Sequence, residues 1–179
     1  MTLKHWKTLS SKPIYKQVRV DQCELPGGQV IEGFVLEYRD WATVVALTPD
    51  QQVVMERQYR HGAGRVLLEV PGGVIDEADA SPLEAARREL LEETGYTSDK
   101  FIQVGKVYPN PANQINSIYY FLALDVKKVA AQHLDGTEEI EVELIPLDEV
   151  VRMAKKGELE QSLQVSALFF ALAHLNRIV

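Results

Sequence analysis

The order of apolar and polar residues predicts strands through the first two-thirds of the chain, with helices among and after them. Short runs rich in Val, Ile, Tyr and Phe end at Gly, Pro, Asn or Asp, a pattern typical of strands. These runs cover residues 15–25, 29–38, 41–49, 51–60, 65–73, 101–108, 117–126 and 139–147. Segments that read as helices follow at residues 147–156 and 162–176. The pattern predicts an α/β protein of the α+β kind, in which helices pack on a mixed sheet.

One further helix is marked at both ends by its sequence. Ser81 suits the N-cap, Pro82 suits the first helical position, and Glu84 stands where a capping box has its acid. Good helix formers follow, and Gly95 is a natural C-terminal stop. We therefore expect a helix over residues 82–94.

Three carboxylates of this helix gather beside its apolar stripe. Glu89, Glu92 and Glu93 fall within an arc of roughly 100°, where like charges repel. Arg88 precedes Glu92 by four residues and is expected to orient it. Clustered oxygen ligands suit Mg²⁺ or Mn²⁺. The alternative is a solvated face, but the glycine turn upstream favours a metal site, to which the Gly72 carbonyl can add a ligand.

Composition and charge exclude some classes of function. The 179 residues fit one domain, residues 1–179, and the net charge of −7 disfavours binding to nucleic acid. The single cysteine, Cys23, makes neither an intrachain disulfide nor a cysteine-rich metal site. Because no signal peptide or membrane-spanning run is recognisable, we expect a cytoplasmic protein without membrane contacts.

The stretch "RELLEETGY" at residues 88–96, with Gly73 upstream, resembles the signature of the Nudix hydrolase family. The resemblance implies a Nudix-type α/β/α sandwich that hydrolyses a nucleoside diphosphate linked to another group, with Mg²⁺ (or Mn²⁺) as cofactor. It also implies roles for the matching residues: Glu89 and Glu93 as principal metal ligands, Glu92 as a further ligand or a base, Gly72 as a carbonyl ligand, and Arg88 as the residue that holds a glutamate in place.

Two parts of the chain depart from the family pattern. Asp79 stands where the family has a Glu, with one extra residue before Arg88. Since the family's Glu mainly supports the loop, we expect an altered loop geometry, with Glu77 as the alternative to Asp79. Downstream, Ala112 replaces the Gly of the Ser-Pro-Gly motif typical of ADP-ribose hydrolases. Gln114 lies where an acid would follow, and its amide can bind a sugar or a base.

Flanking segments look like those of ADP-ribose and nucleoside diphosphate sugar pyrophosphatases, notably "VVMERQYRHG" before "LLEVPGGVID". This likeness implies that Arg39 and Arg60 contact the substrate diphosphate, a role that suits a planar, permanently charged guanidinium. It also implies a catalytic glutamate on the loop before a late strand. Glu138 is favoured for this role, with Glu139 as the alternative.

The predicted function is metal-dependent hydrolysis of the pyrophosphate bond of a nucleoside diphosphate sugar, either ADP-ribose or a hexose derivative. The subgroup also implies a homodimer, with residues 1–40 contributing to the interface and Trp6 as a candidate to stack on the base. One alternative is a Nudix hydrolase of another nucleotide class, such as nucleoside triphosphates or dinucleoside polyphosphates. Another is a non-catalytic regulator that binds a nucleotide sugar, which the presence of all three glutamates disfavours.

Overall fold

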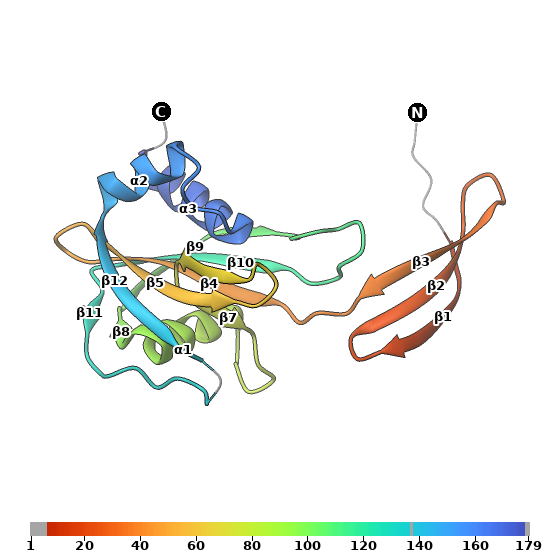
Figure 1. Cartoon of the computed structure of the whole chain (residues 1–179), viewed down its shortest axis with the longest axis horizontal. Coiled ribbons are helices and arrows are strands. Elements are labelled where there is room, and N and C mark those ends of the chain that lie inside the picture. The colour runs from red at the N-terminus through yellow and green to blue at the C-terminus, as the bar shows by residue number, and fades with distance from the viewer. Residues whose placement is uncertain (1–6, 137, 178–179) are drawn as a thin grey trace. The chain divides into compact units, whose positions relative to one another are not determined.

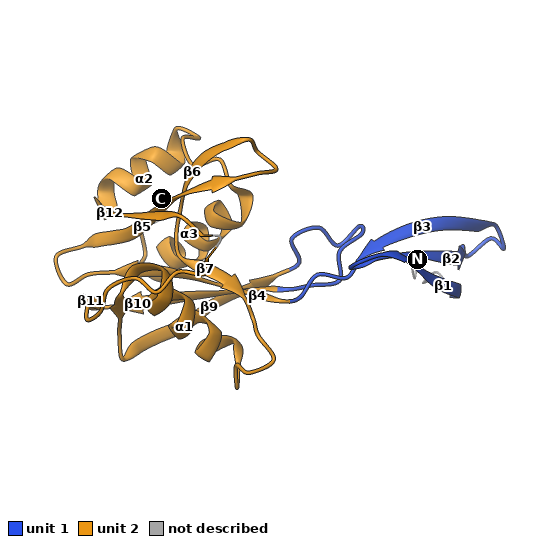
Figure 2. Cartoon of the chain, turned by 60° about the horizontal axis from the view of Figure 1, so that its bottom comes forward, with its two compact units in different colours: residues 1–39, 108–117 blue, residues 40–107, 118–179 orange. Residues whose placement is uncertain are grey.

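The structure is a computed structural model that describes residues 7–136 and 138–177 (Figure 1). The chain divides into two compact units, residues 1–39 with 108–117 and residues 40–107 with 118–179 (Figure 2). Its strands are β1 (Lys7–Tyr15), β2 (Val18–Glu24), β3 (Val30–Leu36), β4 (Trp41–Leu47), β5 (Gln52–Arg60), β6 (Arg65–Glu69), β7 (Gly72–Val74), β8 (Tyr96–Thr97), β9 (Lys100–Val107), β10 (Ile118–Leu124), β11 (Lys127–Lys128) and β12 (Ile140–Pro146). Its helices are α1 (Pro82–Thr94), α2 (Leu147–Lys155) and α3 (Ser162–His174).

The larger unit is built on a mixed sheet. Its strands follow the order β12-β5-β4-β10-β9, while β6 pairs with β5 and β7 pairs with β4. β4 and β10 run parallel, and the remaining pairs are antiparallel. Helix α1 covers one face of this sheet, and α2 and α3 cover the other (Figure 1). The predicted mixed sheet and α/β/α sandwich are confirmed.

The centre of the sheet is apolar on both faces because helices cover both. On β4, Val45 and Leu47 enter the core beneath α2 and α3, whereas Val44 and Ala46 enter the core beneath α1. All four side chains are buried. Since successive residues of a strand point to opposite faces, a strand buried on both sides reads as a continuous apolar run, as "ATVVAL" does.

Helix α1 begins and ends where its sequence predicts. The Ser81 hydroxyl accepts a hydrogen bond from the Glu84 N–H (3.3 Å). Gly95 caps the other end with φ +76°, and its N–H donates to the Leu91 carbonyl (2.8 Å). A Cβ at Gly95 would lie 2.2 Å from the Ala130 carbonyl oxygen, so only glycine lets the chain after β11 pass so close to the helix end.

The smaller unit contains the antiparallel sheet β1-β2-β3. The predicted strand over residues 15–25 begins too early, because the chain turns between Tyr15 and Val18, with Gln17 at φ 58°. Strand β1 itself was not predicted, because its exposed residues show no apolar alternation. Within the same unit, the Leu36 N–H donates to the Asn113 carbonyl (2.7 Å) and attaches the segment 108–117.

The predicted strand over residues 65–73 is two strands, β6 and β7, separated at Val70 and Pro71. The second of them places Gly72 beside Thr43 of β4.

In the described part of the chain, no helix has the length and apolar character needed to cross a membrane.

Candidate active site

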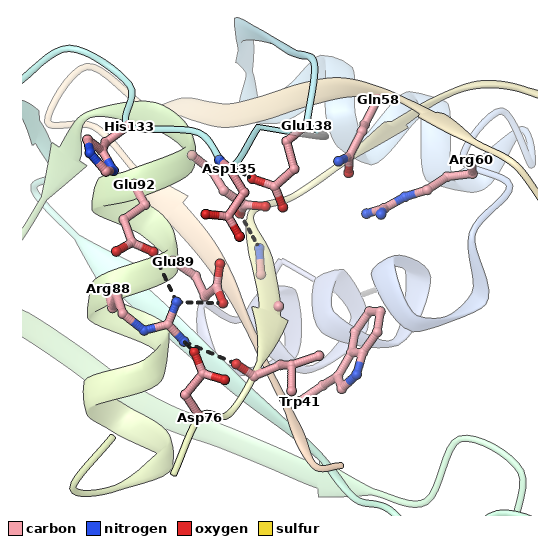
Figure 3. Close-up of a pocket in the computed structure, with 14 residues that line it drawn as sticks. Trp41, Gln58, Arg60, Asp76, Arg88, Glu89, Glu92, His133, Asp135 and Glu138 are labelled. Carbon is pink, nitrogen blue, oxygen red and sulfur yellow. Dashed lines mark hydrogen bonds and ion pairs between the residues drawn. The ribbon is translucent and has the colours of Figure 1, made fainter. Parts of the chain in front are cut away.

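A pocket of about 320 Å³ opens in the larger unit, between the sheet, α1 and the loop before β12. It is lined by Trp41, Gln58, Arg60, Gly72, Gly73, Val74, Asp76, Arg88, Glu89, Glu92, Glu93, His133, Asp135 and Glu138. The carboxylates of Glu89, Glu92 and Asp135 gather at one end (Figure 3). Arg60 and Trp41 lie at the other end. The pocket is therefore acidic on one side, and basic and aromatic on the other.

The glycine pair of β7 lies directly against the carboxylates of α1. The Gly72 N–H donates a hydrogen bond to Glu93 Oε2 (2.8 Å). A Cβ at Gly73 would lie 2.5 Å from Glu89 Oε1, and one at Gly72 would lie 2.5 Å from the Ala42 carbonyl oxygen. Any larger residue would therefore displace either β7 or the glutamates. This close approach is the physical reason why the sequence has two glycines before the helix.

Arg88 organises the exposed side of the acidic cluster. Its guanidinium donates to both carboxylate oxygens of Asp79 (3.1 and 2.9 Å), to Glu89 Oε1 (2.9 Å) and to Glu92 Oε2 (3.0 Å). It also donates to the Val74 carbonyl (3.1 Å). Hydrogen bonding to Asp79, opposed in part by burial, raises the pKa of Arg88 above its usual range. Arg88 is thus fixed between the loop and the helix, and it orients two glutamates.

Asp79 supports the loop that precedes α1. Besides binding Arg88, it accepts a hydrogen bond from the Asp76 N–H (2.7 Å), and its side chain is only 7% exposed. Glu77 is exposed to solvent. The shorter Asp79 side chain thus occupies the supporting position that the sequence left open between these two residues.

Deeper in the unit, several carboxylates are buried close together. Glu93 is 4% exposed, and Glu56 and Glu69 are fully buried. Burial and the charge of Glu56 raise the pKa of Glu93 well above its usual range. Burial likewise raises the pKa of Glu89 to about 7, against the opposing effect of Arg88. Both carboxylate oxygens of Glu56 lack a hydrogen-bond partner within the described residues. These carboxyls therefore hold their protons more tightly than exposed ones, and a bound cation would favour their ionised form.

The loop before β12 brings one of the two candidate glutamates into the pocket. Glu138 lines the pocket, and its carboxylate accepts a hydrogen bond from the Asp135 N–H (3.1 Å). Glu139 lines a different hollow, beside Arg57 and Tyr59. Of the pair, Glu138 thus lines the pocket that the carboxylates of α1 also line.

The segment that carries Glu138 is attached to the C-terminal turn of α1. The His133 N–H donates to the Glu92 carbonyl (2.8 Å). The Gln132 side-chain amide donates to the carbonyls of Glu93 (2.6 Å) and Ile140 (3.1 Å). The bonds to Glu92 and Glu93 satisfy carbonyls at the helix end that have no partner within the helix. They also tie the Glu138 loop to the helix that presents the acidic cluster.

The residues predicted to bind substrate are distributed over both units. Arg60 lines the pocket, where its Nε and Nη2 donate to Glu69 (3.0 and 2.7 Å). Arg39 and Gln114 belong to the smaller unit, so their contact with substrate stays a prediction. Trp6 lies outside the described residues.

The donor set fits a hard divalent cation. Six carboxylates and two arginines line the pocket, and both arginines are paired with acids. All the acidic donors are oxygens, which Mg²⁺ and Mn²⁺ prefer. Within residues 7–136 and 138–177, however, no three acidic, His or Cys side chains converge in a closed metal-binding arrangement. Glu89 turns towards Arg88, and Glu93 turns towards the Gly72 N–H.

Several residues of the site escaped the sequence analysis. Glu56 and Glu69 each interrupt an apolar strand, and this interruption is the signal that would have indicated a role for them. His133 and Asp76 lie on segments without regular spacing, and nothing in the sequence distinguishes them from ordinary loop residues.

Comparison with known proteins places this chain in a family. Residues 37–168 match the model of the NUDIX domain. The chain is 27% identical over 157 residues to ADP-ribose pyrophosphatase from Bacillus subtilis (strain 168), covering 85% of this chain and 84% of that protein. It is 29% identical over 142 residues to GDP-mannose pyrophosphatase from Yersinia pestis (strain Pestoides F), covering 78% and 69%.

A solved structure shares the fold of the chain. The crystal structure of ADP compounds hydrolase superposes with a TM-score of 0.86 at 21% identity, covering 99% of this chain and all of that one. With the domain match over most of the sequence, and with the helix, glycine turn and acidic pocket in place, the chain belongs to the Nudix family of pyrophosphohydrolases, in the subgroup that resembles ADP-ribose pyrophosphatases.

Proposed function

We propose that the protein hydrolyses the pyrophosphate bond of a nucleoside diphosphate sugar, with Mg²⁺ or Mn²⁺ as cofactor. The observation that carries this proposal is the pocket in which Glu89 and Glu93 lie against the glycine turn while Arg60 lies opposite. An anionic diphosphate would be repelled by six carboxylates unless cations accompanied it. Relatives named for hydrolysis of ADP-ribose and of GDP-mannose support this substrate class.

Each group in the pocket has a chemical task in the proposed reaction. Water adds to one phosphorus, the bridging P–O bond breaks, and a nucleoside monophosphate and a sugar phosphate leave. Glu89, Glu93 and the Gly72 carbonyl would hold the metal, with Glu92 as a further ligand or a base. A bound divalent cation would supply charge neutralisation at the phosphates. Glu138 would accept the proton of the attacking water.

A substrate panel tests the proposal. ADP-ribose, ADP-glucose, GDP-mannose and UDP-glucose are incubated with Mg²⁺, and the released monophosphates are measured after treatment with phosphatase. Hydrolysis of at least one of them, abolished by EDTA, is expected. Activity confined to nucleoside triphosphates or dinucleoside polyphosphates would assign another nucleotide class. Binding without turnover of any compound would make the protein a regulator.

Two variants distinguish the two candidate bases. We expect Glu138→Gln to lower kcat by about 100-fold or more, the range for loss of a general base, while Glu139→Gln stays within about twofold of the parent enzyme. Glu139 is the matched control, because it is the adjacent residue and carries the same charge. An equal loss in both variants would mean that the loop's negative charge matters, and not one base.

We further propose a homodimer that uses the smaller unit. Its sheet carries large apolar side chains that are exposed in the single chain, among them Leu9, Ile14, Tyr15, Val30 and Phe34. Contiguous exposed apolar surface is typical of interfaces, and we propose that these side chains form such a surface in the dimer. Analytical ultracentrifugation is expected to give twice the chain mass of 20.1 kDa. Ile14→Lys, which places a charge among these side chains, is expected to shift the protein towards the monomer.

A further inference from the structure

One polar side chain is buried in the otherwise apolar face of α3. Gln164 is 4% exposed, and its buried neighbours on the helix are Ala167, Leu168 and Ala171. A buried amide costs free energy unless it is hydrogen-bonded. The Gln164 amide therefore needs hydrogen-bond partners. Helix α3 lies on the face of the sheet opposite to α1 (Figure 1).

Both ends of the Gln164 amide are bound to β6 and the residue after it. Its Oε1 accepts from the Val70 N–H, and its Nε2 donates to Glu69 Oε2, each at 3.2 Å. Glu69 accepts from Arg60 Nε at 3.0 Å and from Nη2 at 2.7 Å. A continuous chain of hydrogen bonds thus runs from α3, through a fully buried carboxylate, to an arginine that lines the pocket.

The amide supplies Glu69 with a contact that opposes a nearby repulsion. Glu56 is paired with Glu69 across β5 and β6, and its carboxylate is also fully buried. Two acids this close repel each other when both are ionised, which favours rotation of one side chain away from the other. Arg60 and Gln164 together hold Glu69 in place. Without Gln164, the only side chain that would fix Glu69 within the described residues is Arg60 itself.

The orientation of Arg60 depends on this arrangement. Glu69 engages Nε and Nη2, so the guanidinium plane is fixed, and it points into the pocket in Figure 3. In the described part of the chain, the side-chain hydrogen bonds of Arg60 leave from these two nitrogens alone. The donors on Nη1 therefore remain for a ligand. A guanidinium held in a plane binds a phosphate with less loss of rotamer entropy than a mobile one.

We propose that Gln164 is a positioning residue: through Glu69 it directs Arg60 at the diphosphate of the substrate. The inference rests on the proposed function, because it takes the substrate to be a nucleotide diphosphate. It assigns to α3, which has no residue in the pocket, an effect on substrate affinity.

Gln164→Leu tests the proposal, because leucine has a similar size and no hydrogen-bonding group. We expect KM for the preferred substrate to rise about tenfold while kcat stays within about twofold, the pattern of lost ground-state binding. Gln161→Leu is the matched control. It removes the N-cap of the same helix, where the side chain accepts from the Leu163 N–H at 2.6 Å, without contacting Glu69. It should cost comparable stability and leave KM unchanged.

A double-mutant cycle separates positioning from general destabilisation. In an Arg60→Ala background, Gln164→Leu should raise KM no further, because the residue it positions is gone. Effects that multiply in the double variant would overturn the proposal. The proposal would also be overturned if Gln161→Leu, which loses stability without contacting Glu69, raised KM as Gln164→Leu does.

A binding experiment keeps this proposal distinct from the proposed function. Adenosine α,β-methylene diphosphate with Mg²⁺ is titrated calorimetrically into the parent protein and into Gln164→Leu. Binding weakened about tenfold in the variant supports the positioning role even if no sugar nucleotide is hydrolysed. Equal binding in the two proteins overturns the positioning role while leaving the reaction intact. If the parent protein hydrolyses an ADP sugar but does not bind this diphosphate, the positioning role is overturned while the reaction stands.

Discussion

The buried carboxyl of Glu93 is expected to destabilise the fold near neutral pH, although hydrolysis is proposed to need it. Glu93 is 4% exposed and faces Glu56, which is buried and without a hydrogen-bond partner among the described residues. Replacement of Glu93 by Gln removes the ionisable group and keeps an oxygen that can accept from the Gly72 N–H. We expect Glu93→Gln to abolish hydrolysis and, in the absence of metal, to stabilise the fold near neutral pH.

The size of this effect follows from the raised pKa of Glu93. Below its ordinary pKa of 4.5, the carboxyl is protonated in both folded and unfolded chains and contributes nothing. As the pH rises above that value, the folded state keeps the proton at a cost of about 1.4 kcal/mol per pH unit. At about pH 7.5 the cost therefore reaches at most about 4 kcal/mol. An imperfectly bonded glutamine amide gives back about 1–3 kcal/mol, so the net gain is about 1–3 kcal/mol.

Thermal unfolding in EDTA measures the gain directly. For a chain of this length, about 1 kcal/mol moves the melting temperature by about 2–4 °C, so Glu93→Gln should melt several degrees higher at about pH 7.5. Near about pH 5 the penalty falls to about 0.7 kcal/mol, below the cost of the amide, so the variant should melt no higher than the parent protein there. Added Mg²⁺ should stabilise the parent protein, by about 2.7 kcal/mol at 100 times its Kd, and the variant far less.

Glu77→Gln is the control: it removes a charge from the exposed loop before α1 and should leave the melting temperature unchanged. If Glu93→Gln melts no higher than the parent protein in EDTA at either pH, the buried charge is not destabilising. If Mg²⁺ stabilises both proteins equally, Glu93 does not hold the metal.

Three further variants probe the supports of the site. Gly73→Ala places a methyl group 2.5 Å from Glu89 Oε1, so we expect kcat to fall by about 10- to 100-fold in steady-state kinetics; unchanged kcat would mean that Glu89 moves freely. Arg88→Lys replaces a fork that binds both oxygens of Asp79, and urea unfolding should show a loss of about 1–3 kcal/mol. Gln132→Leu frees the loop before β12 from the end of α1; faster amide exchange there and a lower kcat, at unchanged metal affinity, are expected.

The sequence determined the local parts of the site. The spacing of Glu89, Glu92 and Glu93 on one helix, the caps at Ser81 and Gly95, and the positions of most strands along the chain all follow from neighbouring residues. Local periodicity and capping chemistry depend on positions a few residues apart, so a single chain shows them. Strand β1 was missed for the same reason, because its exposed side chains leave no apolar pattern.

Only the tertiary structure decided which distant residues meet. It placed Glu138 and not Glu139 in the pocket, joined Asp79 to Arg88, and linked Arg60 through Glu69 to Gln164. These contacts depend on strand order, on register and on the path of a loop, none of which is encoded in the spacing of adjacent residues. The unusual charge of the site has the same origin: carboxylates from β5, β6 and α1 become buried neighbours only when the sheet and the helix pack together.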